Sequence, residues 1–110
     1  MGKSAWERTQ EEILKERAEV LGRAGEALAT AISETERIDR RIAESIRTAG
    51  ANPALDALAE INGEIRRYNL AREYAQLRYY YLIVTREAMG FRRHKTVEEV
   101  YRIPPKRAYL

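Results

Sequence analysis

The sequence of 110 residues has no cysteine and only one histidine, one tryptophan and one phenylalanine. Without cysteine the chain has no disulfide framework, no thiolate nucleophile and no cysteine-ligated metal site. One histidine excludes a multi-histidine metal site within a chain. His94 also has no glutamate three residues before it, as a di-iron helical bundle requires. Because so little material for an active site is left, we expect a protein that is not an enzyme and that binds no metal or cofactor.

Long hydrophobic runs are also missing. The longest run of apolar residues and tyrosines covers residues 79–84, whereas a membrane-spanning helix needs roughly 20 residues. The first residues, Met-Gly-Lys-Ser-Ala-Trp, contain no apolar stretch of the kind that a signal peptide has. With 34% charged and 45% hydrophobic residues, the composition is typical of a folded domain. We therefore expect a soluble, cytoplasmic protein without membrane contact.

Proline occurs only at positions 53, 104 and 105, and helix-forming residues dominate the rest of the chain. Ser4 and Glu7 have the spacing of a capping box and predict a helix that begins at residue 5. No strong helix-ending residue follows until Gly50, so the first helix should cover about 5–49. At about 1.5 Å per residue, this helix would be roughly 67 Å long.

A second long helix is predicted after the first. Asn52 and Pro53 offer a helix cap followed by proline at the first helical position. Gly90 is suited to the left-handed conformation that ends a helix, so the second helix should cover about 53–89. Since the connection between the two helices is short, they must lie antiparallel, as a hairpin.

A straight hairpin of this length conflicts with a compact shape, for which the radius of gyration would be only about 13 Å. The alternative is a first helix that breaks at Gly22 and Gly25, its weakest points. We favour the hairpin, because it sets apolar residues such as Ile42 and Ile61 opposite each other across the two helices.

The end of the chain forms a separate segment. The run Thr96–Glu99 is a further capping box and predicts a short helix over about 97–102. Pro104 and Pro105 then force an extended tail. We therefore divide the chain into a helical hairpin and a basic C-terminal segment, over residues 1–90 and 91–110.

The apolar faces of both long helices are too wide for one hairpin to cover. In the first helix they span about 140° around the axis, which is wider than the minimal apolar stripe of a surface helix. A lone hairpin would leave much of this surface in water. The predicted fold class is therefore all-α: a long antiparallel helical hairpin with a short C-terminal helix and an extended Pro-Pro tail, which completes a four-helix bundle by dimerisation.

Several polar residues fall on the predicted buried stripe. We expect them to fix register and partner choice, as buried polar residues do in coiled coils. They are Arg17, Thr35, Asp39, Arg72 and Arg86, with Asn62 and Asn69 at the edge of the stripe. Arg17 and Arg86 should face each other near the open end of the hairpin. The alternative is a small-ligand or anion site in the bundle, near Arg72 and Tyr79.

All seven tyrosines lie between positions 68 and 109. We expect core or dimer-interface packing, because tyrosine combines a large apolar body with a polar tip. The alternatives are a stacking platform for bases or a flat cofactor and a hot spot for a protein partner. The candidate aromatic residues are Tyr68, Tyr79, Tyr80 and Tyr81.

The positive charge is concentrated at the end of the chain. Residues 1–50 hold nine basic and ten acidic residues, whereas residues 86–110 hold seven basic and three acidic residues. We therefore expect a surface for a partner or an anion there, made of Arg92, Arg93, His94, Lys95, Arg102, Lys106 and Arg107. Nucleic acid is a less favoured ligand, because Glu98 and Glu99 interrupt the basic run. The tail could instead fold back over a groove of the bundle.

The interpretation that we favour is a non-enzymatic helical bundle that forms a homodimer and serves as a protein-interaction module, of a scaffold, adaptor or chaperone-like kind. One alternative is a small nucleic-acid-binding protein that uses the basic C-terminal end. The other is a bundle that holds a small ligand or anion near Arg72 and Tyr79.

Overall fold

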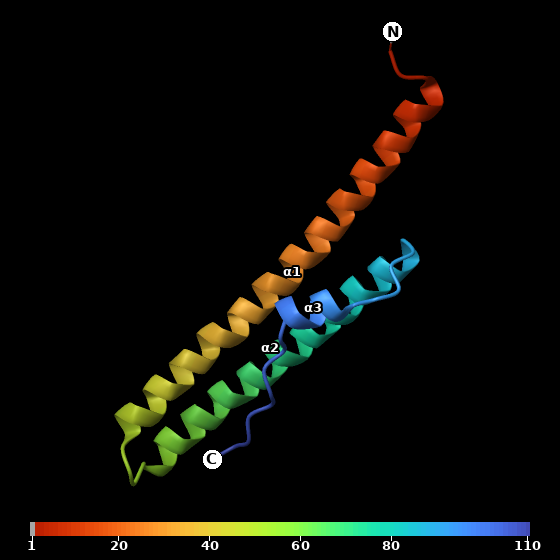
Figure 1. The fold of residues 1–110 in the computed structure, drawn as a ribbon. Helices are drawn as coiled ribbons and strands as arrows, with labels where there is room; N and C mark the ends of the chain where they lie inside the picture. Colours follow the sequence, from red (N-terminus) through yellow and green to blue (C-terminus); the bar gives the residue numbers. More distant parts are fainter. Residues whose placement is uncertain (1) are drawn as a thin grey trace.

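A computed structural model describes residues 2–110 and contains three helices in this part of the chain. Helices α1 (Ala5–Ala49) and α2 (Leu55–Ala88) pack against each other as an antiparallel hairpin, and α3 (Lys95–Val100) lies against one side of it (Figure 1). No strand occurs within residues 2–110. The predicted all-α hairpin with a short third helix and an extended tail is confirmed.

Helix α1 has the predicted bounds. The Ser4 hydroxyl oxygen accepts a hydrogen bond of 3.1 Å from the backbone N–H of Glu7, as the capping box predicts. Gly50 ends the helix with φ of 79°, and its N–H donates to the Ile46 carbonyl. The helix runs through Gly22 and Gly25 without a break, so the compact alternative is wrong.

Helix α2 begins two residues later than predicted, at Leu55 rather than residue 53. Asn52 and Pro53 belong to the turn between the helices, and Ala54 is the N-cap residue without a side-chain hydrogen bond. Asp56 supplies the acidic residue of the first turn, where its carboxylate accepts from the Ala57 N–H at 2.9 Å. The helix therefore starts without the asparagine cap that the sequence suggested.

The end of α2 follows the glycine rule. Gly90 has φ of 94°, in the left-handed region. Its N–H donates to the Glu87 carbonyl, and the Phe91 N–H donates to the Arg86 carbonyl, both at 3.0 Å. This pair of bonds is a Schellman motif, which satisfies carbonyls that the helix leaves free.

Helix α3 begins two residues earlier than predicted, at Lys95 instead of residue 97. It also ends two residues earlier, at Val100 instead of residue 102. Thr96 lies inside its first turn and does not cap it, so the second capping box is wrong. His94 takes the N-cap position. Its ring contacts Arg86 and Glu87 in the last turn of α2, which places the start of α3 by a tertiary contact that the local sequence does not contain.

Two clusters of buried residues form the core. The cluster nearer the turn contains Ile38 and Ile42 of α1 with Ile61, Ile65 and Tyr68 of α2, so Ile42 and Ile61 meet as predicted. The second cluster joins all three helices and contains Leu28, Leu82 and Val97. Because the first cluster lies between two helices and only the short α3 adds to the second, the core is thin.

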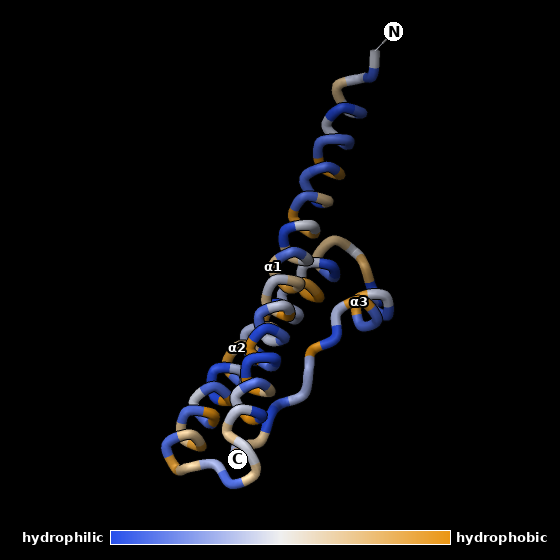
Figure 2. The backbone as a smooth tube through the Cα atoms, turned by 90° about the vertical axis from the view of Figure 1, so that its left-hand side faces the viewer, coloured by the Kyte–Doolittle hydropathy of each residue, from blue (hydrophilic) through white to orange (hydrophobic). Residues whose placement is uncertain are grey.

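The molecule is a rod of 76 × 24 × 18 Å with a radius of gyration of 20.6 Å. The N-terminal part of α1 extends beyond the end of α2 (Figure 1). In that part, residues 2–20 are all exposed except for the half-buried Ile13. After α3, the tail of residues 103–110 runs back along the hairpin toward its turn, in both of two perpendicular views (Figure 2).

Candidate interaction surfaces

The tail of residues 103–110 is held by two asparagine side chains of α2. The Asn69 amide donates from Nδ2 to the Arg107 carbonyl and accepts at Oδ1 from the Arg107 N–H, both at 3.0 Å. The Asn62 amide does the same with Leu110, at 3.2 and 2.8 Å. Each asparagine thus pairs with both main-chain groups of one tail residue, as a neighbouring β-strand would.

The spacing of the two asparagines matches the spacing of the tail residues that they hold. Asn62 and Asn69 are seven positions apart, which is two helical turns or about 10.5 Å. Arg107 and Leu110 are three positions apart, which is about 10 Å in an extended chain. A helix and an extended segment can therefore stay in register here over two successive contacts.

Two further side chains hold the proline part of the tail. Arg72 Nε donates to the Pro104 carbonyl at 2.6 Å, and the Tyr68 hydroxyl donates to the Pro105 carbonyl at 2.8 Å. Proline has no backbone N–H to satisfy, and at these two positions the groove presents donors to the carbonyls. The groove therefore satisfies the main-chain carbonyls of both prolines.

Among the tail side chains, Arg107 makes an ion pair with one residue and a cation–π contact with another. Its Nη1 lies 2.6 Å from Asp39 Oδ1 on α1, and its guanidinium lies 6.0 Å from the centre of the Tyr68 ring. Tyr68 is only 3% exposed. Burial, and next the Asp39 carboxylate, raise the pKa of the Tyr68 phenol above its ordinary value. We call Asp39, Asn62, Tyr68, Asn69 and Arg72 the tail groove.

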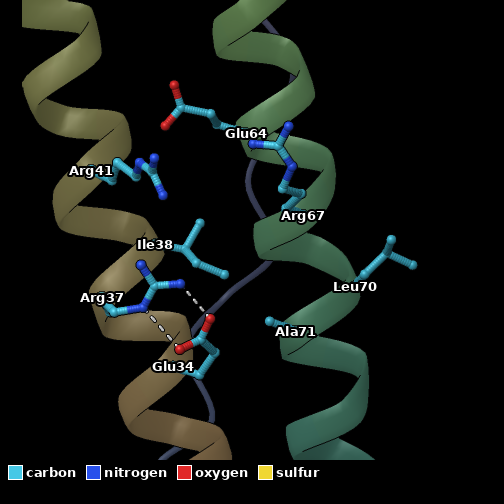
Figure 3. A pocket seen from close by; sticks show the side chains of 8 residues that line it. All are labelled: Glu34, Arg37, Ile38, Arg41, Glu64, Arg67, Leu70 and Ala71. Atoms are coloured by element: carbon cyan, nitrogen blue, oxygen red, sulfur yellow. Dashed lines mark hydrogen bonds and ion pairs between the residues drawn. The ribbon is translucent and has the colours of Figure 1, made fainter.

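A second groove lies on the other side of the hairpin. In Figure 3 the tail passes behind the two helices, while a cavity of about 340 Å³ faces the viewer. Arg41 of α1 and Arg67 of α2 line this cavity from its two sides (Figure 3). Glu64 Oε1 accepts from the Ser45 hydroxyl at 2.9 Å, and its Oε2 is buried without a hydrogen-bond partner among the described residues. Arg37 binds Glu34 through two hydrogen bonds, which lower the pKa of the Glu34 carboxyl.

Apolar side chains continue from this groove along the outward face of α2. They alternate at spacings of four and three residues, and each is between 43 and 54% exposed. We call them the outer stripe; they are Leu70, Tyr74, Leu77, Tyr81 and Val84. The spacing is that of the core positions of a coiled coil. The buried residues of α2 lie on the opposite side of the helix, so the hairpin leaves the stripe uncovered.

The four candidate aromatic residues have different environments. Tyr68 lies in the core cluster near the turn, whereas Tyr79 is half-buried against the cluster that includes Val97. Burial, and then the charge of Glu98, raise the pKa of the Tyr79 phenol. Tyr80 and Tyr81 are exposed, and Tyr81 belongs to the outer stripe. Tyr68 and Tyr79 therefore pack within the chain, and the other two are available to a partner.

The polar residues predicted on the buried stripe also have different environments. Thr35 has no exposed surface, and its hydroxyl donates to the Ile32 carbonyl at 2.6 Å. Asp39 and Arg72 hold the tail. Arg17 is exposed, because α1 extends past α2, so its predicted pairing with Arg86 is wrong. Arg86 instead donates to His94 Nδ1 at 3.2 Å and to the Arg93 carbonyl.

The seven basic candidates do not gather in one place. Arg92, Arg93, His94 and Lys95 belong to the connection between α2 and α3 and the start of α3, whereas Lys106 and Arg107 lie along the middle of the hairpin. Arg102 follows α3, between the two groups. Arg107 is paired with Asp39, and His94 contacts Glu87. The net charge of the segment therefore does not form a single basic surface.

Sequence reasoning noticed Asn62 and Asn69 but did not assign them to the tail. The available signal was their seven-residue spacing on one helix together with an extended Pro-Pro segment. It also missed the outer stripe, although the four-and-three spacing of Leu70, Tyr74 and Leu77 is visible in the sequence. The continuous apolar run at 79–84 hid the second half of that pattern.

No model of a known protein family matches the chain, and neither curated proteins nor solved structures give a match. Residues 2–110 contain no cluster of acidic and histidine side chains suited to a metal ion. None of the three described helices is both long enough and apolar enough to cross a lipid bilayer. The function must therefore be inferred from the two grooves and the outer stripe.

Proposed function

We propose that the protein is a non-enzymatic protein-interaction module, which self-associates through the outer stripe and so completes a four-helix bundle. The observation that carries this proposal is the exposed run of large apolar residues with coiled-coil spacing on α2. A contiguous apolar stripe of this kind typically marks an interface, since burying it releases ordered water. A second copy is the partner that is always available to the chain.

An antiparallel arrangement of two α2 helices makes the stripe complementary to itself. With the two-fold axis between Tyr74 and Leu77, Tyr74 of each copy lies beside Leu77 of the other. Leu70 then lies beside Tyr81, so each layer joins an aromatic and an aliphatic side chain. The same register sets Arg66 near Glu87, twice by symmetry. Exposed ion pairs add little affinity, but they favour one orientation over its reverse.

Leu77 lies near the proposed axis, so its replacement tests the stripe. Leu77→Glu would place two carboxylates in the interface, and the desolvation of these charges would separate the copies. Light scattering should give about 25 kDa for the native chain, twice its 12.7 kDa, and 12.7 kDa for Leu77→Glu. Leu55→Glu is the matched control, because Leu55 is 86% exposed at the start of α2 and outside the stripe. A native mass of 12.7 kDa at micromolar concentration would contradict the proposal.

A further inference from the structure

We propose that the tail groove is a binding site for extended, arginine-bearing peptide segments of other proteins, and that residues 104–110 occupy it within the chain. This goes beyond self-association, since the tail groove and the outer stripe use different residues. The groove makes seven hydrogen bonds to the tail, and six of them go to main-chain atoms. Main-chain atoms are common to every extended peptide, so this part of the recognition does not depend on the tail's own sequence.

Selectivity for an arginine in the bound segment comes from the part of the groove that contacts the Arg107 side chain. The Asp39 carboxylate supplies the charge partner, and the face of the Tyr68 ring supplies a surface on which a guanidinium stacks. The two donors Arg72 and the Tyr68 hydroxyl bind main-chain carbonyls and leave no N–H unpaired at the two proline positions, so proline is tolerated there. The ligand class is therefore an extended segment that carries an arginine at the position of Arg107.

The tail occupies this site, but several of its residues remain exposed to solvent. Pro105, Lys106 and Ala108 are exposed, and Tyr109 and Leu110 are 56 and 59% exposed. Beyond Ile103, which packs against the second core cluster, the tail is thus held mainly by hydrogen bonds and one ion pair, which water can replace. Asn69 and Tyr68, in contrast, are buried beneath it. Because these groups lose their partners when the tail leaves, another extended segment should take its place.

The test is a labelled peptide with the sequence of residues 102–110, added to the full-length protein and followed by fluorescence anisotropy. The tethered tail competes at a high effective concentration, so the native chain should bind the peptide weakly. Arg107→Ala weakens the tethered tail but leaves the groove intact. This variant should bind the peptide roughly tenfold more tightly than the native chain.

Three comparisons decide whether the binding uses the groove. Adding Asn69→Ala or Asn62→Ala to Arg107→Ala should weaken binding at least severalfold. Asn62 is only half-buried, so its replacement keeps the proposal testable even if Asn69→Ala unfolds the chain. Exchanging for alanine the peptide's arginine that corresponds to Arg107 should have a similar effect. Arg92→Ala, which changes an exposed arginine outside the groove, should bind as weakly as the native chain.

The proposal is overturned if Arg107→Ala binds the peptide no better than the native chain does. It is also overturned if binding to Arg107→Ala survives both asparagine replacements, because the peptide would then be held by general electrostatic attraction. Neither outcome would change the mass measured by light scattering, so the self-association of the outer stripe is judged separately.

Discussion

At the scale of single residues, Tyr68 is the side chain on which the parts of the molecule converge. Its ring lies in the core cluster with Ile42 and Ile65, its hydroxyl holds the Pro105 carbonyl, and the Arg107 guanidinium lies over its face. The tail therefore acts as a third layer over one side of the two-helix core. Loss of the tail would expose an aromatic residue that the hairpin cannot cover by itself.

The Tyr68 phenol gives a prediction about pH. Its pKa is raised by burial and by Asp39, so the folded state keeps this proton at higher pH than the unfolded state, whose tyrosines titrate at about pH 10. The stabilisation is therefore fully present below about pH 10 and is lost as the pH rises through the raised pKa. An absorbance titration of the native chain should show a delayed tyrosine component that decreases in Tyr68→Phe.

Tyr80→Phe is the matched control for this titration, because Tyr80 is exposed and lies outside the core. The delayed component should persist in that variant. If Tyr68→Phe and Tyr80→Phe titrate identically, the burial of Tyr68 beneath the tail is contradicted. The folded state of each variant is checked from its helical circular dichroism at neutral pH.

At the scale of elements, α1 is a continuous helix of 45 residues despite two internal glycines. They have different surroundings. A methyl group on Gly25 would lie 3.0 Å from the Tyr101 hydroxyl, whereas a methyl group on Gly22 would meet nothing within 4 Å. Gly25 thus lets the residue that follows α3 approach the α1 backbone closely. Gly22 has no such role in the chain.

Alanine replacements at the two glycines should therefore differ. Gly22→Ala should raise the free energy of unfolding by about 0.5–1 kcal/mol, because alanine is the better helix former. Gly25→Ala should raise the free energy of unfolding by less, because the Tyr101 hydroxyl must move to admit the methyl group. In a Tyr101→Phe background, which removes that hydroxyl, the gain from Gly25→Ala should approach that of Gly22→Ala. Urea unfolding measures all three, and equal gains at both glycines in the native background would contradict the close contact.

Local signals predicted both ends of α1 and the end of α2, whereas the start of α3 is explained by a tertiary contact. Ser4, Gly50 and Gly90 act through bonds to their own helix ends, so sequence spacing is enough to find them. The start of α3 depends on contacts of His94 with α2, which no local pattern contains. The asparagine contacts of the tail are likewise invisible, since they join residues 38 and 48 positions apart.

At the scale of the whole molecule, the chain is a rod with a thin core. Its radius of gyration of 20.6 Å far exceeds the value of about 13 Å for a compact chain of this length. The sequence predicted this elongation from helix length and a short turn. It could not predict how the two sides of the hairpin differ, because that depends on where the tail docks. The tail covers one side, and the outer stripe stays open on α2.

In the proposed dimer, two copies meet through the outer stripe in an antiparallel register. Disulfide cross-linking tests it directly, because the native chain has no cysteine and an introduced cysteine has no competitor. In the proposed register, Leu70 of one copy lies beside Tyr81 of the other, within reach of a disulfide. The two Leu70 side chains lie roughly 16 Å apart along the helix axis, too far for a disulfide.

The decisive measurement is therefore oxidation of three samples: Leu70→Cys alone, Tyr81→Cys alone, and an equal mixture of the two. We predict that a disulfide-linked dimer forms in the mixture and in neither single variant. Cross-linking of Leu70→Cys with itself would contradict the antiparallel register. Absence of a cross-linked dimer from all three samples would contradict association through the outer stripe.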